Sequence, residues 1–137
     1  MIKMKIAVSA SGNSLDANVD PRFGRCSYFI IVEVEDNEIK SHEVVNNQAT
    51  EAMRGAGIQA AQTVANKGAK VLITGNIGPN AFNVLSQTGI KVVTGVSGKV
   101  SEVVKKYLNG ELKEITRPTF GFGQGMDRGF GGGRWNR

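Results

Sequence analysis

Short apolar runs alternate with helical patterns through the second half of the chain. Residues 71–74 and 91–94 are runs of the length expected for buried strands. Apolar residues recur at helical spacing in the segments around them, at 56–66, 79–89 and 98–110. Strands that alternate with helices pair in parallel through right-handed crossovers, with helices covering both faces of the sheet. The second half of the chain therefore predicts an α/β fold.

The first half predicts three strands, two of which form a hairpin. A run at 5–9 breaks into a long loop, and runs at 28–34 and 39–45 flank the turn residues Asp36-Asn37. We therefore predict a single-domain, mixed five-stranded sheet in the order 3-2-1-4-5, with strand 2 antiparallel and with three helices. This is the arrangement of ribonuclease H-like folds. Ser97 is predicted to cap the third helix.

Composition divides the chain at about residue 116. Its 137 residues fit one domain, predicted at 1–116. Residues 117–137 hold seven of the 18 glycines, four aromatic residues and four arginines, a composition typical of a flexible tail. With four Arg and one Asp the tail carries +3 of the net charge of +5, leaving +2 for 1–116. The basic balance therefore says little about the domain.

Several classes of protein are disfavoured. No apolar stretch approaches the roughly 20 residues that span a bilayer, and the N-terminus has no signal-peptide pattern, so we expect a cytoplasmic protein with no membrane partner. One cysteine permits no internal disulfide and no four-cysteine metal site. The sequence has no GxxxxGK[ST] phosphate loop. The predicted strand ends carry Ser9, Ser11 and Thr74 rather than the clustered carboxylates that a nuclease needs.

The predicted topology places a ligand crevice at the carboxyl ends of the parallel strands, beside strand 1. Helices that open at Ala56-Gly57 and Gly78-Pro79 would direct backbone amides and positive dipole ends into it. Arg22, Arg25 and Arg54 would add charged donors, each hydrogen bond contributing about 1.5–3 kcal/mol. We therefore expect an anionic ligand. The loops predicted to converge there are 9–25, 46–57, 75–79 and 94–98.

The predicted ligand-binding residues share these loops. They are Ser11, Gly12, Arg22, Arg25, Arg54, Gly55, Gly57, Asn76 and Gly78.

Other candidate residues have both a structural and a functional interpretation. Cys26 begins strand 2 at the crevice end and is the candidate metal ligand, although a lone cysteine is commonly an inert core residue. Arg22 and Arg25 either bind the ligand or fix the loop through carboxylates such as Asp16 or Asp20. The remaining candidates, Met53 and His42, are interpreted as packing and surface residues.

Three strings carry a resemblance. They are VDPRFGRC at 19–26, GAGIQAAQ at 55–62 and TGNIGPNAF at 74–82. Together they resemble the dinitrogenase iron-molybdenum cofactor biosynthesis family, which includes nitrogenase cofactor carriers and the orange-coloured molybdenum-copper sulfide protein. The resemblance covers about residues 4–116. It implies a ribonuclease H-like α/β domain that binds an anionic metal–sulfur cluster or its precursor and is not an enzyme.

The sequence departs from some of these relatives in the loop before the first helix. Cofactor carriers often have a histidine there, whereas residues 51–55 read EAMRG. A noncovalent cage of amides and arginines therefore fits a molybdenum- or iron-containing sulfide cluster better than covalent ligation does. Some family members are encoded near ATPases of iron–sulfur assembly, which suggests such an ATPase as a partner.

Two other functions compete with a cluster carrier. The Gly/Arg tail could bind nucleic acid through cations and aromatic residues, but four single-strand phosphate contacts would give a salt slope of only about −3. An enzyme acting on a small phosphorylated metabolite would use the same helix starts, yet no general base is evident. The sequence thus favours a non-catalytic binding or carrier protein.

Overall fold

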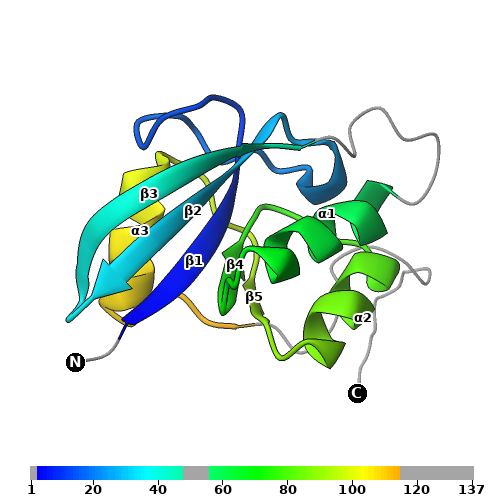
Figure 1. Cartoon of the computed structure of the whole chain (residues 1–137). Coiled ribbons are helices and arrows are strands. Elements are labelled where there is room, and N and C mark those ends of the chain that lie inside the picture. Colours follow the sequence, from blue (N-terminus) through cyan, green and yellow to red (C-terminus); the bar gives the residue numbers. More distant parts are fainter. Residues whose placement is uncertain (1–2, 48–55, 115–137) are drawn as a thin grey trace, which may run out of the picture.

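The computed structural model describes residues 3–47 and 56–114 of the chain (Figure 1). None of the helices in these ranges combines the length and the apolar character that crossing a bilayer requires. The elements in chain order are β1 (Lys3–Ala10), the 3-10 turn η1 (Phe23–Arg25), β2 (Tyr28–Glu35), β3 (Glu38–Asn46), α1 (Ala56–Asn66), β4 (Val71–Ile73), α2 (Pro79–Gln87), β5 (Lys91–Val93) and α3 (Val100–Leu108).

The five strands form one sheet in the order β3-β2-β1-β4-β5. β2 runs antiparallel to β1 and β3, while β1, β4 and β5 are parallel. Asp36 and Asn37, the two residues of the hairpin loop, have φ of 55° and 66°, as a tight primed turn requires. The predicted sheet is therefore confirmed, and it is consistent with a ribonuclease H-like motif.

Helices cover both faces of the sheet, with α1 and α2 on one side and α3 on the other (Figure 1). Successive residues of a strand point to opposite faces. Ala7 of β1 accordingly belongs to the core under α1 and α2, whereas Ile6 and Val8 belong to the core under α3. These residues are fully buried, and the short strand β4 is buried throughout, as the apolar runs predicted.

The long loop after β1 is divided between the two faces. Its first part carries Leu15, Ala17 and Val19, which pack with the core under α3. Its second part turns to the other face, where Phe23 enters the core under α1 and α2 and lies 5.4 Å from Phe29 between ring centroids. This division decides which loop residues reach the candidate site.

The start of α3 differs from the prediction. The helix begins at Val100, with Lys99 rather than Ser97 at the N-cap position and no side-chain cap. The reason lies in the loop after β1, because the amide of Val100 donates to the carbonyl of Ala17 (2.9 Å) and the amide of Ser101 to that of Leu15 (3.0 Å). Backbone carbonyls thus do what the serine hydroxyl was expected to do.

Part of the predicted organisation lies outside the described residues. Segments 48–55 and 115–137 contain Met53, Arg54, Gly55 and the whole tail at 117–137. The predicted boundary near residue 116 and the predicted roles of these residues therefore stay predictions.

Candidate functional site

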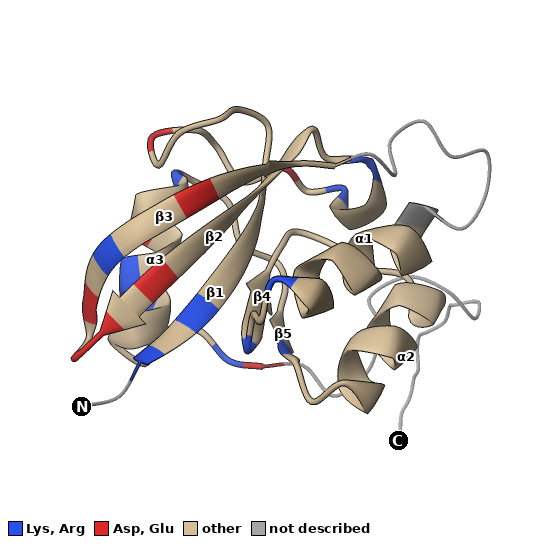
Figure 2. Cartoon of the chain, in the orientation of Figure 1, with Lys and Arg blue, Asp and Glu red and all other residues tan. Residues whose placement is uncertain are grey.

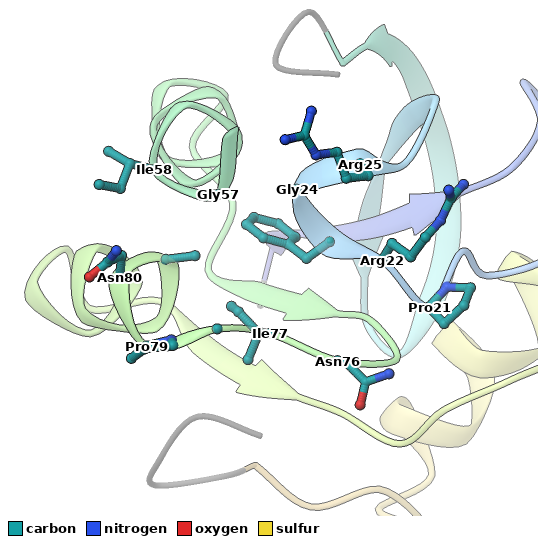
Figure 3. Close-up of a pocket in the computed structure, with 13 residues that line it drawn as sticks. Pro21, Arg22, Gly24, Arg25, Gly57, Ile58, Asn76, Ile77, Pro79 and Asn80 are labelled. Carbon is teal, nitrogen blue, oxygen red and sulfur yellow. The ribbon is translucent and has the colours of Figure 1, made fainter. Parts of the chain in front are cut away.

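A cavity of about 530 Å³ lies among the η1 loop, the start of α1 and the segment that leads from β4 into α2 (Figure 3). Its volume falls within the range of about 300–1,000 Å³ that is usual for small-molecule sites. We call it the arginine cavity. Its lining residues are Pro21, Arg22, Phe23, Gly24, Arg25, Gly57, Ile58, Asn76, Ile77, Gly78, Pro79, Asn80 and Ala81.

The arginine cavity occupies the edge of the sheet that the topology predicts. β1 and β4 are parallel neighbours, and the segments after them supply the loop around η1 and the loop 75–78. Two of the thirteen lining residues, Arg22 and Arg25, are cationic, and none is Asp or Glu. The charged side chains that line the cavity therefore all favour an anion.

Two walls of the cavity are joined through their backbones. The amide of Asn76 donates to the carbonyl of Pro21 (2.9 Å), and Arg22 pairs with Asn76 in a parallel bridge. Gly75 makes this approach possible, since a Cβ atom there would lie 2.5 Å from Cα of Pro21. The loop that carries the arginines is thus fixed against the loop that leads into α2.

The third wall is formed where α1 and α2 begin side by side. A Cβ atom on Gly57 would lie 3.3 Å from Cβ of Ala81, so the two helix starts are close. Gly78 is the N-cap of α2, Pro79 follows it, and no side chain caps this turn. The positive end of the α2 dipole and the amides of its first turn therefore face the region where Arg22 and Arg25 lie (Figure 3).

Much of the lining is apolar, which the sequence analysis did not anticipate. Phe23 and Ile77 are buried, Ile58 is half-buried, and Pro21 and Pro79 complete the apolar surface. Each of these apolar residues is adjacent in the sequence to a predicted site residue, namely Arg22, Gly57 or Gly78. That adjacency was the sequence signal that could have identified them. These walls exclude water from part of the ligand surface.

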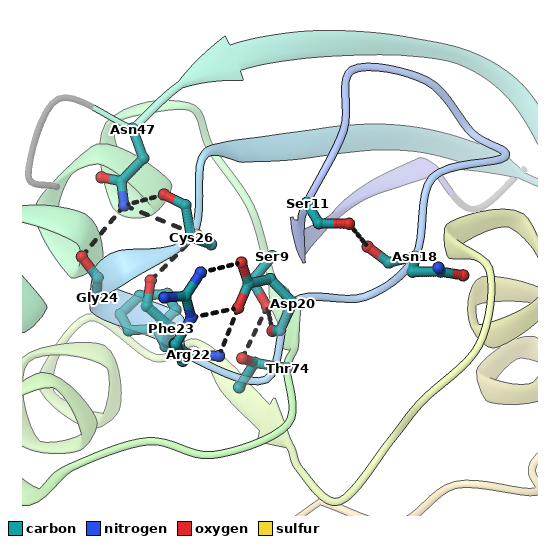
Figure 4. A network of polar contacts seen from close by, with 10 residues as sticks. All are labelled: Ser9, Ser11, Asn18, Asp20, Arg22, Phe23, Gly24, Cys26, Asn47 and Thr74. Carbon is teal, nitrogen blue, oxygen red and sulfur yellow. Dashed lines mark hydrogen bonds and ion pairs between the residues drawn. The ribbon is translucent and has the colours of Figure 1, made fainter.

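Arg22 forms a two-pronged ion pair with Asp20 (Figure 4). Its Nε lies 3.1 Å from Oδ1 and its Nη2 lies 3.1 Å from Oδ2, while its backbone amide donates to Oδ1 at 2.9 Å. Burial would raise the pKa of Asp20, but the hydrogen bonds and positive charge of Arg22 outweigh it and lower that pKa below its usual value. Arg22 therefore pairs with Asp20, one of the two carboxylates that the loop-fixing interpretation named.

Asp20 is itself fixed to the end of β1. Its amide donates to the carbonyl of Ser9 (2.9 Å), and the Ser9 hydroxyl donates to the carbonyl of Asp20 (2.7 Å). The hydroxyl oxygen of Ser9 also lies 2.8 Å from that of Thr74, at the end of β4. Ser9, Asp20 and Thr74 are all buried. Ser9 and Thr74, two of the three polar residues predicted at the strand ends, thus form a scaffold with Asp20 behind the cavity.

Arg25 is the second cationic residue of the cavity. It is exposed, ends the η1 turn and extends from that turn at the side nearest the start of α1 (Figure 3). Arg22 and Arg25, both in the predicted set of ligand-binding residues, thus lie together at this cavity, while their role in binding stays a prediction.

Cys26 does not face the cavity. Its side chain is fully buried in the core under α1 and α2, and its thiol donates to the carbonyl of Phe23 (3.1 Å). Burial, followed by the nearby charge of Asp20, raises the pKa of the thiol to about 12, so it is protonated at neutral pH. The expectation that its sulfur faces the crevice is wrong, and the alternative of a core cysteine describes its placement.

Asn47 supports the same turn from behind and was not selected from the sequence. Its side-chain amide is buried and donates to the carbonyls of Cys26 (2.8 Å) and Gly24 (3.2 Å), with Sγ of Cys26 3.7 Å away (Figure 4). A buried asparagine that closes a loop gives no local sequence signal, because its partners lie 21 and 23 positions away.

Other predicted site residues lie elsewhere. Ser11 and Gly12 are absent from the lining, because their part of the loop turns toward α3, where Ser11 bonds to the carbonyl of Asn18 (3.3 Å). The segment 94–98 is likewise absent from the lining. Gly57, Asn76 and Gly78 do line the cavity, as predicted, whereas Arg54 and Gly55 fall outside the described residues.

A protein metal centre has no support in the described part of the chain. Within residues 3–47 and 56–114, no three His, Cys, Asp or Glu side chains form a group that could hold a metal ion. His42 is exposed on β3, in line with the predicted surface role.

The chain belongs to the dinitrogenase iron-molybdenum cofactor family, whose model matches residues 4–110. Membership relates the chain to that cofactor and supports a role other than catalysis. The resemblance carried by the three sequence strings is thereby confirmed.

Individual relatives agree with this assignment. An uncharacterised protein of Methanocaldococcus jannaschii is 40% identical over 112 residues, which are 82% of this chain and 92% of that protein. The apo form of the orange protein from Desulfovibrio gigas is 39% identical with a TM-score of 0.81, over 85% of this chain and 97% of that one. A Thermotoga protein described as NifB-like is 36% identical with a TM-score of 0.68, over 83% and 97%.

Proposed function

We propose that the chain is a non-catalytic binding or carrier protein for an anionic molybdenum- or iron-containing sulfide cluster, or for a precursor of one. The observation that carries the proposal is the arginine cavity, where two guanidinium groups and the starts of two helices surround a space whose lining contains no carboxylate. The cluster is cargo in this proposal, and the protein contributes hydrogen bonds, positive potential and shape.

The apolar walls favour a large, soft anion over a small, strongly hydrated one. Phe23, Ile58 and Ile77 cannot replace the water that phosphate loses on entry. The sulfur surface of a thiometallate is weakly hydrated and polarizable, so contact with these side chains costs it less. Membership of an iron-molybdenum cofactor family supports the same class of ligand.

The cargo would be held without a metal–cysteine bond. The Cys26 thiol is buried and protonated, and a thiol must lose its proton to ligate a metal. The proposed holding groups are Arg22, Arg25 and the backbone amides at the start of α2. An assembled cluster could then enter and leave without a ligand-exchange reaction at the protein.

Anaerobic reconstitution tests this proposal. The metal-free protein is mixed with tetrathiomolybdate and either Cu(I) or Fe(II), then separated by gel filtration. We expect a coloured, co-eluting complex, and we expect Arg22→Ala/Arg25→Ala to lower uptake about tenfold or more, since each charged hydrogen bond contributes about 1.5–3 kcal/mol when made.

A charge-matched control separates the site from net charge. Lys70→Ala/Lys91→Ala removes two exposed cations at the N-terminal ends of β4 and β5, whereas the cavity lies beyond the C-terminal end of β4. This variant should retain uptake. Absence of colour in the wild-type eluate would reject the proposal. Equal losses in the two double variants would reject the site.

An ATPase of iron–sulfur assembly is the partner we propose for delivery or release of the cargo. The reconstituted complex would be mixed with such an ATPase and ATP, and the charge-transfer band of the carrier followed. ATP-dependent loss of the band supports the partnership, and an unchanged band with an active ATPase opposes it.

A phosphorylated metabolite is the competing ligand, because helix starts bind phosphate well. Inorganic phosphate, nucleotides and sugar phosphates would be offered in competition with tetrathiomolybdate. Displacement by one of them at low concentration would favour an enzyme or a metabolite-binding protein over a cluster carrier.

A further inference from the structure

We infer that Asp20 is a positioning residue of the arginine cavity and that it acts by holding the guanidinium of Arg22 in place. The inference rests on the proposed function, because it concerns how the same cavity binds an anion. Asp20 itself is absent from the cavity lining, so it does not contact a ligand there and any hydrogen bonds to a ligand come from other residues.

The pair joins a very exposed side chain to a very buried one. The side chain of Arg22 is 67% exposed, whereas that of Asp20 is 3% exposed. An exposed arginine without an anchor samples many rotamers, and a ligand that orders it must offset the lost entropy. Here Asp20 orders the guanidinium before any ligand arrives.

The anchor is rigid in its own right. The backbone of Asp20 exchanges hydrogen bonds with Ser9, whose hydroxyl also meets Thr74 at 2.8 Å. These contacts tie Asp20 to the ends of β1 and β4, the neighbouring strands that end at the cavity. The Arg22 guanidinium is thus held in place by the sheet, through Asp20, and not only by the loop that carries it.

The geometry of the fork leaves donors for a ligand. A guanidinium has five N–H groups. The carboxylate engages Nε and Nη2 along one edge of the group, at 3.1 Å each. The remaining N–H groups, including both on Nη1, stay in the plane that the fork fixes. Arg22 therefore presents oriented donors to the cavity it lines.

Asp20 also has a second effect on anion binding, which lowers the affinity. Its negative charge cancels much of the charge of Arg22 at a distance, which lowers the affinity for any anion. Removal of the carboxylate thus frees positive charge but releases the arginine. We infer that the loss of orientation is the larger effect, because the hydrogen bonds of a fixed donor are short-ranged and directional.

A double-mutant cycle tests the inference, with tetrathiomolybdate as the probe in equilibrium dialysis. Asp20→Asn keeps an oxygen that accepts from the Arg22 amide but loses the charged fork. We expect it to weaken binding about three- to tenfold when Arg22 is present, and to have no weakening effect in an Arg22→Gln background. Asp16→Asn removes an exposed charge from the same loop and is the matched control, expected to bind as well as wild type or slightly better.

Salt concentration distinguishes orientation from charge. The electrostatic gain in Asp20→Asn is screened as salt rises, while lost orientation is not. The ratio of the dissociation constant of Asp20→Asn to that of wild type should therefore be larger at about 0.5 M than at about 0.05 M salt. A purely structural role would instead weaken binding equally with and without Arg22.

The outcomes are separable. Tighter binding by Asp20→Asn, or equal weakening with and without Arg22, overturns the inference while leaving the carrier proposal intact. Absence of probe binding by the wild type overturns the carrier proposal itself. If Asp20→Asn does not fold by circular dichroism, Arg22→Lys, which keeps the charge and loses the fork, must weaken binding to a similar extent at both salt concentrations.

Discussion

Two hollows of equal volume lie in different parts of the molecule and differ in almost everything else. The arginine cavity and a second hollow, which we call the α3 groove, each measure about 530 Å³. The α3 groove is lined by Leu15, Asn37, Glu38, Ile39, Ser101, Lys105, Leu108 and Asn109. It holds one cation and one anion, whereas the lining of the arginine cavity holds two cations and no anion.

The backbone reinforces this contrast. The arginine cavity lies where α1 and α2 begin, at the positive ends of their dipoles. The α3 groove instead follows α3 from Ser101, near its start, to Leu108 and Asn109 at its end, so it is not confined to a positive helix end. Figure 2 shows both blue and red segments on the strands at the hairpin end of the sheet, and blue segments at η1, within the part of the chain that the structure describes. Volume alone therefore does not mark a binding site here.

The largest effect should follow from adding a side chain at Gly75, where the two loops of the arginine cavity are in close contact. A methyl group in Gly75→Ala would collide with Cα of Pro21 at 2.5 Å, so one backbone must move. We expect a loss of about 1–3 kcal/mol in the free energy of unfolding, as overpacking usually causes, together with lost tetrathiomolybdate uptake. Urea unfolding and equilibrium dialysis measure the two effects.

Gly78→Ala is the control for this change. A Cβ atom there meets nothing within 4 Å, and its φ of −86° suits any residue. This variant should unfold within about 1 kcal/mol of wild type, the range for a glycine N-cap replaced by alanine. Equal destabilisation of the two variants would mean that the Pro21–Gly75 approach has no special role.

A carboxylate introduced first into the arginine cavity and then into the α3 groove tests which of the two binds the anion. Ile58 in the arginine cavity and Ile39 in the α3 groove are both half-buried. Ile58→Asp should weaken tetrathiomolybdate binding about tenfold or more by charge repulsion, and an acid near the start of α1 should still fold. Ile39→Asp should bind normally.

Ile58→Asn provides the neutral comparison, because it loses the same apolar contacts without gaining a charge. Dialysis against the same probe should find it between wild type and Ile58→Asp. Comparable defects at Ile58 and Ile39 would show that the arginine cavity is not where the anion binds.

The sequence predicted the fold around the arginine cavity better than it predicted the placement of individual side chains there. Short apolar strands such as Val71–Ile73 can be buried only inside a helix-covered sheet, so strand order and the position of the crevice followed from local patterns. Residues that open helices, Gly57 and Gly78, were correctly placed in the lining for the same reason.

Side chains whose role depends on distant partners were less predictable. The loop after β1 reads as one polar segment, yet Leu15, Ala17 and Val19 draw its first half to α3 and take Ser11 with them. Nothing local distinguishes this half from the half that carries Arg22. Burial of Cys26 depends likewise on Asn47, which the tertiary fold brings to it from 21 positions along the chain.

The smallest effect concerns Cys26, which lies behind the arginine cavity without lining it. Cys26→Ala should retain tetrathiomolybdate uptake within about twofold, since the variant loses packing and the thiol hydrogen bond to Phe23 but no group that lines the cavity. If the thiol ligated the metal, this variant would instead lose the coloured complex.

The pH dependence of stability provides an independent measurement of the same burial. The pKa of the thiol is raised from an ordinary value of 9.0 to about 12 in the folded protein. The folded state thus keeps the proton that the unfolded state releases, so the stabilising contribution is complete below pH 9 and is lost as the pH rises toward 12. The free energy of unfolding should fall by up to about 1.4 kcal/mol per pH unit more steeply in wild type than in Cys26→Ala. Parallel slopes in urea titrations of the two proteins would show that the thiol is more accessible to water than its burial indicates.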